Sequence, residues 1–426
     1  MEQNERAPLG QWPEGVSSPE TGIQLGRALA AERKRVVVAT DMARSSRMMC
    51  EALIAGLLSQ GADVIDGGIA PEPAVAYAAR RGDCAVFVKE DGSQSRYVVF
   101  NKDGSPFTKE QIRHTETSLG GIVAPDYSGI GDRLEYGRAA EDYADHLELE
   151  LGKTYKSPTA IDCRCGTAAL VAPRVIGSKV ISIDGHPDHG QRSAEGPLDE
   201  DGLSNLIDIV KAEDGYIGAG FDRSGSRAVI IDEEGKPISH FEAAAIVASY
   251  LRPKKVVASA DTSSLVEESC ADAEYLIASC DAGSVAKKMV EEGADIGICG
   301  DGLMYRDLPS PDPFRTAAIL SEIAYSDSLS RMCLAMPVRY WREESLPIGE
   351  DLSAFTRGMN ENVDEMQTVR VSAADGWRVD LEGGWFLIRK PADGHVRVLA
   401  ESTDRAYLVG LMETASDLMR NSSHHQ

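Results

Sequence analysis

The chain has 426 residues, of which 44 are Lys or Arg and 68 are Asp or Glu, so its formal net charge is −24. This acidity argues against nucleic acid and anionic membranes as partners, because both require compensating cations. No apolar stretch is long enough to cross a bilayer, and residues 1–20 lack the basic and apolar regions of a signal peptide, so we expect a cytoplasmic location. A chain of this length exceeds one ordinary hydrophobic core and predicts two to four domains.

Short apolar runs alternate with amphipathic helical patterns in the first part of the chain. Residues 34–41, 62–68 and 84–91 predict buried strands. Residues 45–61 and 72–82, which lie between these runs, predict helices. Alternation of this kind is typical of a mostly parallel sheet that is covered by helices.

The same pattern recurs and then changes. Further strand and helix patterns occupy 158–177, 179–185, 204–215, 254–273, 274–280 and 313–326. From about residue 337 the sequence differs, because 368–390 alternates between glycine turns as an antiparallel meander does, and a closing helix is predicted at 404–421. We therefore predict an α/β protein with three similar mixed or parallel α/β domains at 1–150, 151–252 and 253–336, and an α+β domain at 337–426.

Three segments resemble the α-D-phosphohexomutase family of phosphomannomutases, phosphoglucomutases and phosphoglucosamine mutases. VVVATDMARSS at 36–46 is similar to the family's first strand and its Arg-x-Ser-Ser turn, which implies a substrate-binding role for Arg44. Residues 51–80 resemble the helix, strand and Pro-x-Pro segment that follow, and 218–239 resembles the strand pair around the metal loop. The resemblance implies a four-domain architecture, a monomer or homodimer, and chemistry that moves a phosphate between the 1- and 6-positions of a hexose.

The resemblance also implies that one loop from each domain meets at a central cleft: a phosphoserine loop, a Mg²⁺ loop, a sugar-reading loop and a phosphate-binding loop. Counting along the strand at 84–88 places Asp91 at the phosphoserine position, with Ser93 or Ser95 as a shifted alternative. Asp91 can accept a phosphoryl group, imitate the charge of a phosphoserine, or belong to an ordinary acidic turn. The sequence alone leaves these alternatives open.

The second loop, GFDRSGSR at 220–227, keeps Asp222 and Arg227 but has Ser224 and Ser226 where the family carries two further aspartates. Mg²⁺ prefers carboxylate oxygens and water in octahedral geometry, and neutral hydroxyls supply no countercharge. The neighbouring Arg223 adds a positive charge that opposes cation binding. We therefore predict a degenerate metal site without tightly bound Mg²⁺, and an ion pair between Asp222 and Arg227.

The third and fourth loops also depart from the family pattern. In CGDGLMYRD at 299–307, Asp301 keeps a carboxylate for the sugar, although a Gly-Asp-Gly turn explains it equally well. In IRKPADGHVRV at 388–398 the hydroxyl-rich centre is absent, but four basic residues remain as a candidate anion site: Arg389, Lys390, His395 and Arg397. The alternative is that these cations only solvate strand ends.

Changes in all four loops of an intact framework predict a phosphohexomutase-like protein that has lost mutase activity, that is, an inactive homologue or pseudoenzyme. Such a protein would act in carbohydrate metabolism by binding a sugar phosphate or a protein partner, and it would need no cofactor. The alternative is an active phosphomannomutase- or phosphoglucomutase-type intramolecular phosphotransferase with unusual loops. Only this alternative requires Mg²⁺, because the charge that develops during phosphoryl transfer needs a cation or its substitute.

Overall fold

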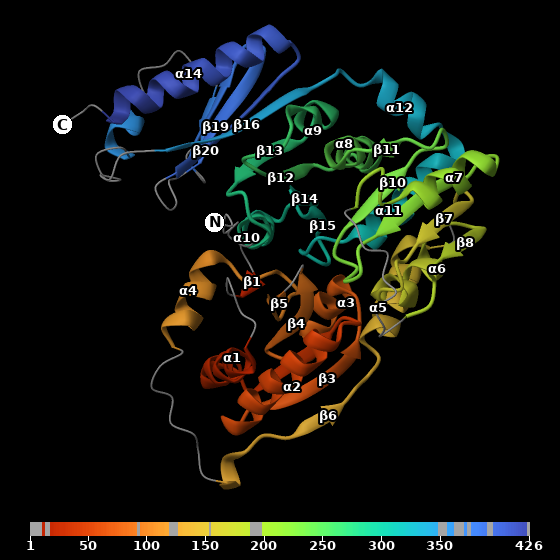
Figure 1. Ribbon diagram of the computed structural model, residues 1–426, viewed down its shortest axis with the longest axis vertical. Coiled ribbons are helices and arrows are strands. Elements are labelled where there is room, and N and C mark those ends of the chain that lie inside the picture. Colours follow the sequence, from red (N-terminus) through yellow and green to blue (C-terminus); the bar gives the residue numbers. More distant parts are fainter. Residues whose placement is uncertain are drawn as a thin grey trace.

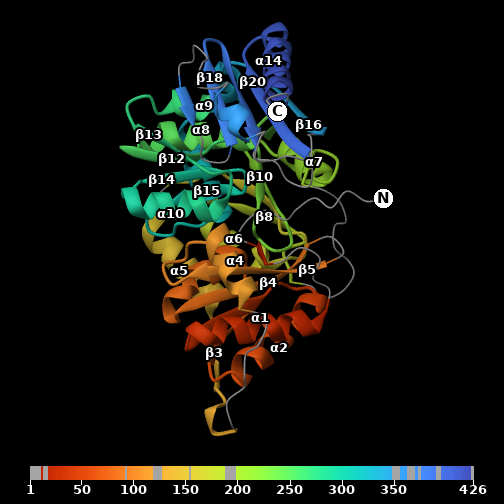
Figure 2. The same cartoon turned by 90° about the vertical axis from the view of Figure 1, so that its left-hand side faces the viewer.

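The structure is a computed structural model, and it describes residues 11–12, 18–91, 94–118, 127–152, 155–187, 198–347, 356–361, 370–372, 376–389 and 395–423. Over these residues the chain forms four β-sheets with associated helices (Figure 1). The first and fourth sheets lie at opposite ends of the molecule, with the other two between them (Figure 2). No helix of the described residues combines the length and apolar character that a bilayer span requires.

The first sheet has the strand order β1-β5-β4-β2-β3-β6. Its strands are β1 (Gln11–Trp12), β2 (Arg35–Thr40), β3 (Asp63–Ile69), β4 (Cys84–Asp91), β5 (Gln94–Asn101) and β6 (Arg133–Glu135). Its helices are α1 (Pro19–Glu32), α2 (Arg44–Ser59), α3 (Glu72–Ala78), α4 (Lys109–Thr117) and α5 (Ala139–Leu151). Strands β3 and β4 pair with β2 in parallel, and β5 pairs with β4 antiparallel. A central parallel strand is buried on both faces, which explains why β2 is rich in valine.

The second and third sheets are mixed, with the orders β11-β10-β9-β7-β8 and β13-β12-β14-β15. The second contains β7 (Thr159–Asp162), β8 (Val180–Ile183), β9 (Ile217–Phe221), β10 (Ala228–Ile231) and β11 (Pro237–Ile238), with α6 (Ala172–Val175), α7 (Ser204–Ala212) and α8 (His240–Leu251). The third contains β12 (Lys255–Ser259), β13 (Glu274–Ala278), β14 (Ile296–Cys299) and β15 (Gly302–Tyr305), with α9 (Ser264–Ser269), α10 (Ala282–Glu292), α11 (Pro313–Ser326) and α12 (Leu329–Ala335). The turns β9–β10 and β14–β15 both lie at the carboxyl edge of parallel strands, as the turn β4–β5 does. Ligands of α/β sheets bind at this edge.

The fourth sheet is antiparallel throughout, in the order β16-β20-β19-β18-β17. Its strands are β16 (Tyr340–Pro347), β17 (Arg370–Ser372), β18 (Gly376–Leu381), β19 (Gly384–Arg389) and β20 (His395–Ser402). Helix α14 (Arg405–Ser423) covers one face, where Leu411 and Met412 pack with Trp377 and Phe386. On the opposite face Trp385 and Leu387 pack with Ala260 after β12, so the central strand β19 is buried on both faces.

One hydrophobic core is shared by the first three sheets. It contains Phe87 of β4, Phe221 of β9 and Phe314 of α11, all fully buried. The rings of Phe221 and Phe314 stack with their centroids 4.8 Å apart. Because a close-packed core transmits displacement, the shared core fixes the positions of the three sheet-edge turns relative to one another.

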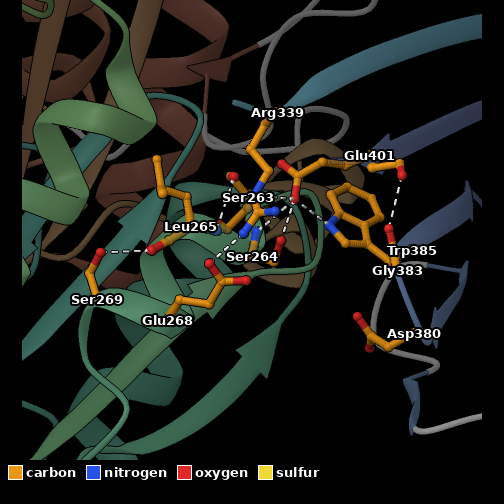
Figure 3. A network of polar contacts seen from close by, with 12 residues as sticks. Ser263, Ser264, Leu265, Glu268, Ser269, Arg339, Asp380, Gly383, Trp385 and Glu401 are labelled. Atoms are coloured by element: carbon orange, nitrogen blue, oxygen red, sulfur yellow. Dashed lines mark hydrogen bonds and ion pairs between the residues drawn. The ribbon is translucent and has the colours of Figure 1, made fainter. Parts of the chain in front are cut away.

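Buried polar contacts attach the fourth sheet to the third. Glu401 of β20 is 1% exposed, and its Oε1 accepts hydrogen bonds from Nε1 of Trp385 at 3.1 Å and from the backbone N of Ser264 at 3.0 Å (Figure 3). Arg378 of β18 donates to the carbonyl oxygens of Ala260 and Thr262 at 2.9 and 3.0 Å. Buried charged groups need such partners to offset their lost hydration.

The structure confirms the predicted α/β fold class with its additional antiparallel sheet. The predicted strand at 84–91 coincides with β4, and the predicted closing helix at 404–421 corresponds to α14. Each sheet lies within one of the four predicted domain segments. The domain boundaries themselves stay a prediction.

Candidate functional site

The first candidate loop is a tight hairpin. Strands β4 and β5 pair without interruption from Cys84 opposite Asn101 to Asp91 opposite Gln94. The predicted site residue Ser93 lies outside the described residues. Asp91 is 45% exposed, and its Oδ2 lies 2.8 Å from Nε of Arg96. The structure therefore places Asp91 at the end of the hairpin, in an ion pair with the neighbouring strand.

The second candidate loop is the turn between β9 and β10, which its own aspartate organises. Oδ1 of Asp222 accepts hydrogen bonds from the backbone N of Ser226 at 2.7 Å and of Arg227 at 3.2 Å, and Ser224 Oγ donates to Oδ2 at 3.0 Å. Gly225 has a φ of +66°, a conformation that L residues rarely adopt. The Asp222 carboxylate therefore closes the turn by accepting from backbone N–H groups four and five residues ahead.

Lys89 connects the first loop to the second. Its Nζ lies 2.7 Å from Oε2 of Glu72, the first residue of α3, and donates to Ser226 Oγ at 3.1 Å. The Ser226 hydroxyl also hydrogen-bonds to Glu72 and lies 2.7 Å from Ser224 Oγ, which reaches Asp222. The two serines predicted as degenerate metal ligands therefore link a buried ammonium to a partly buried carboxylate.

Arg227 connects the second loop to the third. Its Nη2 lies 3.2 Å from Oδ1 of Asp301, which occupies the short turn between β14 and β15. The predicted ion pair between Asp222 and Arg227 is wrong, because Asp222 accepts only the backbone N–H of Arg227 while the guanidinium reaches across to Asp301. The sequence could not show this partner, since the contact depends on how two sheets pack.

Glu90 of β4 precedes Asp91 in the hairpin, and its carboxylate contacts a hydroxyl and a guanidinium. Ser45 Oγ donates to Oε1 at 3.2 Å, and Nη1 of Arg223 lies 3.6 Å from Oε2. The predicted substrate-binding residue Arg44 precedes Ser45 as the first residue of α2. It lines a shallow hollow of about 240 Å³ together with Arg47, Met48 and Glu51.

The candidate anion site of the fourth sheet is only partly described. Arg389 pairs with Asp261 of the third sheet's edge, and Arg397 Nη1 lies 3.7 Å from Oε1 of Glu343. His395 is exposed at the start of β20, and Lys390 lies outside the described residues. Both described arginines thus have a carboxylate partner that an incoming phosphate would have to displace.

Burial and charge act in opposite directions on the groups of the second loop. Burial lowers the pKa of Lys89, but the carboxylates of Glu72 and Asp222 raise it by more, so the net shift is upward. Burial raises the pKa of Asp222 above its ordinary value, although Lys89 and two backbone N–H groups oppose that shift. The ammonium is therefore held as a cation within this cluster.

These residues do not fit a divalent cation. Mg²⁺ requires near-octahedral oxygen ligands at about 2.0–2.1 Å and is usually held by carboxylates. Asp222 is the only carboxylate of the turn 222–227, and both of its oxygens already accept hydrogen bonds. The Glu72 carboxylate binds the Lys89 ammonium instead. Across the described ranges no group of three or more His, Cys, Asp and Glu side chains could hold a metal ion.

Comparisons with known proteins extend over nearly the whole chain. Residues 17–121 match the family described as "Phosphoglucomutase/phosphomannomutase, alpha/beta/alpha domain I". The chain is 28% identical over 421 residues to the "Probable phosphoglucosamine mutase" of Methanocella arvoryzae, which covers 95% of this chain and 94% of that protein. These matches make the chain similar to the α-D-phosphohexomutase family over nearly its whole length.

Solved structures of the family share the fold. A phosphoglucomutase/phosphomannomutase family protein from Burkholderia thailandensis superposes with a TM-score of 0.79 at 20% identity, covering 99% of this chain and 96% of that chain. An N-acetylphosphoglucosamine mutase from Aspergillus fumigatus, solved in complex with GlcNAc-6P and magnesium, gives a TM-score of 0.54 at 13% identity over 90% of this chain and 82% of that chain. At these identities the likeness concerns the fold alone.

The comparisons confirm the predicted family and favour the alternative that we drew for its activity. Relatives are named as mutases, and nothing in the comparisons supports a loss of activity. One fold neighbour was solved with magnesium. The expectation that no cofactor is needed is therefore not supported by the comparisons. The roles of the individual site residues stay predictions.

Sequence reasoning missed Lys89 and Glu72. The signal was present, because Lys89 ends an otherwise apolar run, CAVFV, and a charged residue there must find a buried partner. Glu72 lies between two prolines in the Pro-x-Pro segment, 17 residues earlier. Only the packing of α3 against the β9–β10 turn shows that the two residues meet.

Proposed function

We propose that this protein acts on hexose phosphates, with hexosamine phosphates as the favoured class, and moves a phosphate between the 1- and 6-positions of the sugar. The observation that carries this proposal is the similarity to a phosphoglucosamine mutase over 95% of the chain. The contacts of Lys89 with Ser226 and of Arg227 with Asp301 support it, since they bring three sheet-edge loops together.

Asp91 is the proposed phosphoryl acceptor. One of its carboxylate oxygens would attack the phosphorus of a hexose 1,6-bisphosphate, the phosphorus–oxygen bond to the sugar would break, and the sugar oxygen would take up a proton. If the group taken is the 1-phosphate, the sugar leaves as the 6-phosphate. The aspartyl phosphate would then pass its phosphoryl group to the free 6-hydroxyl of an entering hexose 1-phosphate, which gives up its proton, so that the carboxylate and the 1,6-bisphosphate are both regenerated. The half-exposed carboxylate and the neighbouring Arg96 guanidinium, 2.8 Å away, suit an anionic substrate at this position.

The remaining candidates have binding roles in this proposal. Asp301 would accept a hydrogen bond from a sugar hydroxyl, and Arg227 would turn from Asp301 toward a phosphate. Arg389, Arg397 and His395 would bind the phosphate that is not transferred, and Arg44 would border the opposite side of the hairpin. Guanidinium groups suit this task because they bind phosphate oxygens in a bidentate manner.

A second candidate function is non-catalytic binding of a sugar phosphate, with a regulatory role or a protein partner. The observation that favours it is that Asp91 already forms an ion pair with Arg96 at the end of a tight hairpin. In this case the Asp91 carboxylate imitates the charge of a phosphoserine and transfers nothing. The cytoplasmic location and the monomeric or homodimeric state are retained as predictions under both candidates.

Phosphorus NMR separates the two candidates. The full chain is incubated with glucosamine 1-phosphate, a catalytic amount of glucosamine 1,6-bisphosphate, and Mg²⁺, and the 6-phosphate resonance is followed. The proposal expects conversion that Asp91→Asn abolishes and that the exposed control Glu110→Gln retains. Mannose and glucose 1-phosphates are tested in parallel to define the sugar class.

Calorimetric titration of the same sugar phosphates completes the comparison. Binding without conversion would support the second candidate and contradict the first. Conversion that Asp91→Asn retains would remove the acceptor role from Asp91, and loss of binding in Arg397→Ala would assign the anion site to the fourth sheet. Neither binding nor conversion would contradict both candidates.

A further inference from the structure

The Lys89 ammonium occupies a position with the properties of a cation site. Lys89 is 7% exposed, and its Nζ has a carboxylate oxygen of Glu72 at 2.7 Å and the hydroxyl of Ser226 at 3.1 Å. Ser226 and Ser224 continue this set of oxygens toward Asp222. A buried positive charge with oxygen partners from two segments offsets the repulsion between two carboxylates, as a bound ion would.

The same contacts disfavour a second cation, because they already use the oxygen ligands and place a positive charge nearby. A divalent ion at Asp222 would need the hydroxyls of Ser224 and Ser226, but both are engaged within the cluster. It would also lie close to the ammonium, and repulsion between cations is strong where burial reduces screening. Arg223, whose guanidinium lies 3.6 Å from Glu90, adds further positive charge at the edge of the turn.

The Lys89 ammonium belongs to a side chain of the protein, so it cannot exchange with solution as a bound metal ion does. Lys89 is held in the β4–β5 ladder opposite Arg96, and the next backbone N–H, that of Glu90, donates to Asp41 Oδ2 at 2.7 Å. A metal ion exchanges with solution, and chelators remove it. A lysine side chain in a strand does neither, although its single charge is smaller than that of Mg²⁺.

We infer that the Lys89 ammonium takes the place of a divalent cation in this protein. The turn has Ser224 and Ser226 where the resembling family carries two further aspartates, so it holds less negative charge. This smaller negative charge suits an ammonium with a single positive charge. The turn between β9 and β10 therefore holds no Mg²⁺. Instead it presents a fixed positive charge beneath the edge where the three loops meet. This inference is independent of whether the protein converts its sugar phosphate or only binds it.

Binding of Mn²⁺ tests the inference without any sugar phosphate. Free Mn²⁺ is measured by electron paramagnetic resonance while it is titrated into the full chain, and three proteins are compared: wild type, Lys89→Met, and Lys89→Met combined with Ser224→Asp and Ser226→Asp. We expect wild type to leave the ion free and the triple variant to bind one Mn²⁺ per chain. A wild-type site that is lost in Asp222→Asn would overturn the inference, and so would a folded triple variant that binds no ion.

Chemical rescue provides a second measurement that needs only a folded single variant. Lys89→Ala leaves Glu72 and Asp222 without their counterion, so its Tm should fall below that of wild type. Ethylammonium chloride should restore part of this loss, whereas tetraethylammonium chloride at equal ionic strength should not, because it cannot donate hydrogen bonds. Lys102→Ala, which removes an exposed lysine after β5, is the matched control. Equal effects of both salts on Lys89→Ala would overturn the inference.

Discussion

Arg227 and Asp301 form an ion pair between the turns of the second and third sheets, with Nη2 of the arginine 3.2 Å from Oδ1 of the aspartate. The two residues are 74 positions apart in the sequence. Their side chains are 57% and 28% exposed, so solvent and ligands can reach the pair. The pair lies beside the buried Lys89 cluster, because Asp222 and Arg227 belong to the same short turn.

Replacing Arg227 by alanine should weaken sugar-phosphate binding about tenfold, which corresponds to about 1.4 kcal/mol and is typical of one charged hydrogen bond. The Tm should change little, since exposed ion pairs contribute about 0–1 kcal/mol to stability. Calorimetric titration of glucosamine 6-phosphate measures the affinity. Arg420→Ala, which removes an exposed arginine of α14, should bind as wild type does. Unchanged affinity in Arg227→Ala would exclude this arginine from the binding site.

Gly225→Ala should destabilise the protein by about 2–4 kcal/mol, because it combines a strained backbone with a steric clash. At Gly225 the φ is +66°, and an added Cβ would lie 2.6 Å from Cβ of Pro71. Gly137 has a φ of +60° with nothing within 4 Å of the added atom, so Gly137→Ala should cost about 1–2 kcal/mol from backbone strain alone. Thermal melts of both variants give the difference. Equal Tm losses would show that the β9–β10 turn is not packed against Pro71.

Arg378→Lys should loosen the attachment of the fourth sheet, although the charge is retained. Arg378 is 2% exposed, donates to two carbonyl oxygens of the third sheet's edge, and stacks over Trp385 with its Cζ 4.1 Å from the ring centroid. A lysine cannot reproduce this planar set of contacts, so we expect a loss of about 2–4 kcal/mol. The half-exposed Arg342→Lys on β16 is the control. Limited proteolysis should release a fragment near residue 337 faster in Arg378→Lys only.

Stability should fall in acid in part because of Asp307. Burial raises the pKa of this carboxyl, but the contacts with His146 at 3.0 Å and Arg315 at 2.5 Å lower it by more, so its folded pKa lies below its ordinary value. A carboxyl with a depressed pKa contributes stability above its unfolded pKa of about 3.9, and this contribution is lost as the pH falls through the folded pKa.

The variant Asp307→Asn isolates this contribution. At pH 7 its free energy of unfolding should lie about 1–2 kcal/mol below that of wild type after allowance for partial exposure, so its Tm should be lower. The two Tm values should converge as the pH falls below about 4. A Tm difference that is constant between neutral pH and about pH 2 would mean that Asp307 does not titrate in this range. Exposed Asp272→Asn serves as the control for general acid effects.

Local pattern was sufficient for the framework of the fold. The apolar run of β4 at 84–91 and the amphipathic period of α14 are properties of adjacent residues, so both elements could be predicted within a few positions. The loss of two carboxylates from the turn after β9 was equally visible. The partner of Arg227 could not be predicted, because a flexible arginine can reach several carboxylates and only the packing of two sheets selects Asp301.

The sequence by itself determined the alternating strands and helices that resemble the α-D-phosphohexomutase family, with serines at 224 and 226 and a lysine at 89. Residue identities and local periodicity need no tertiary information. Only the tertiary structure decided that these residues meet, because Glu72, Lys89 and Ser226 come from separate segments and are brought together by the core that the first three sheets share. Burial then gave the ammonium its strength as a counterion, since the same charge on an exposed strand end would be screened by water and salt.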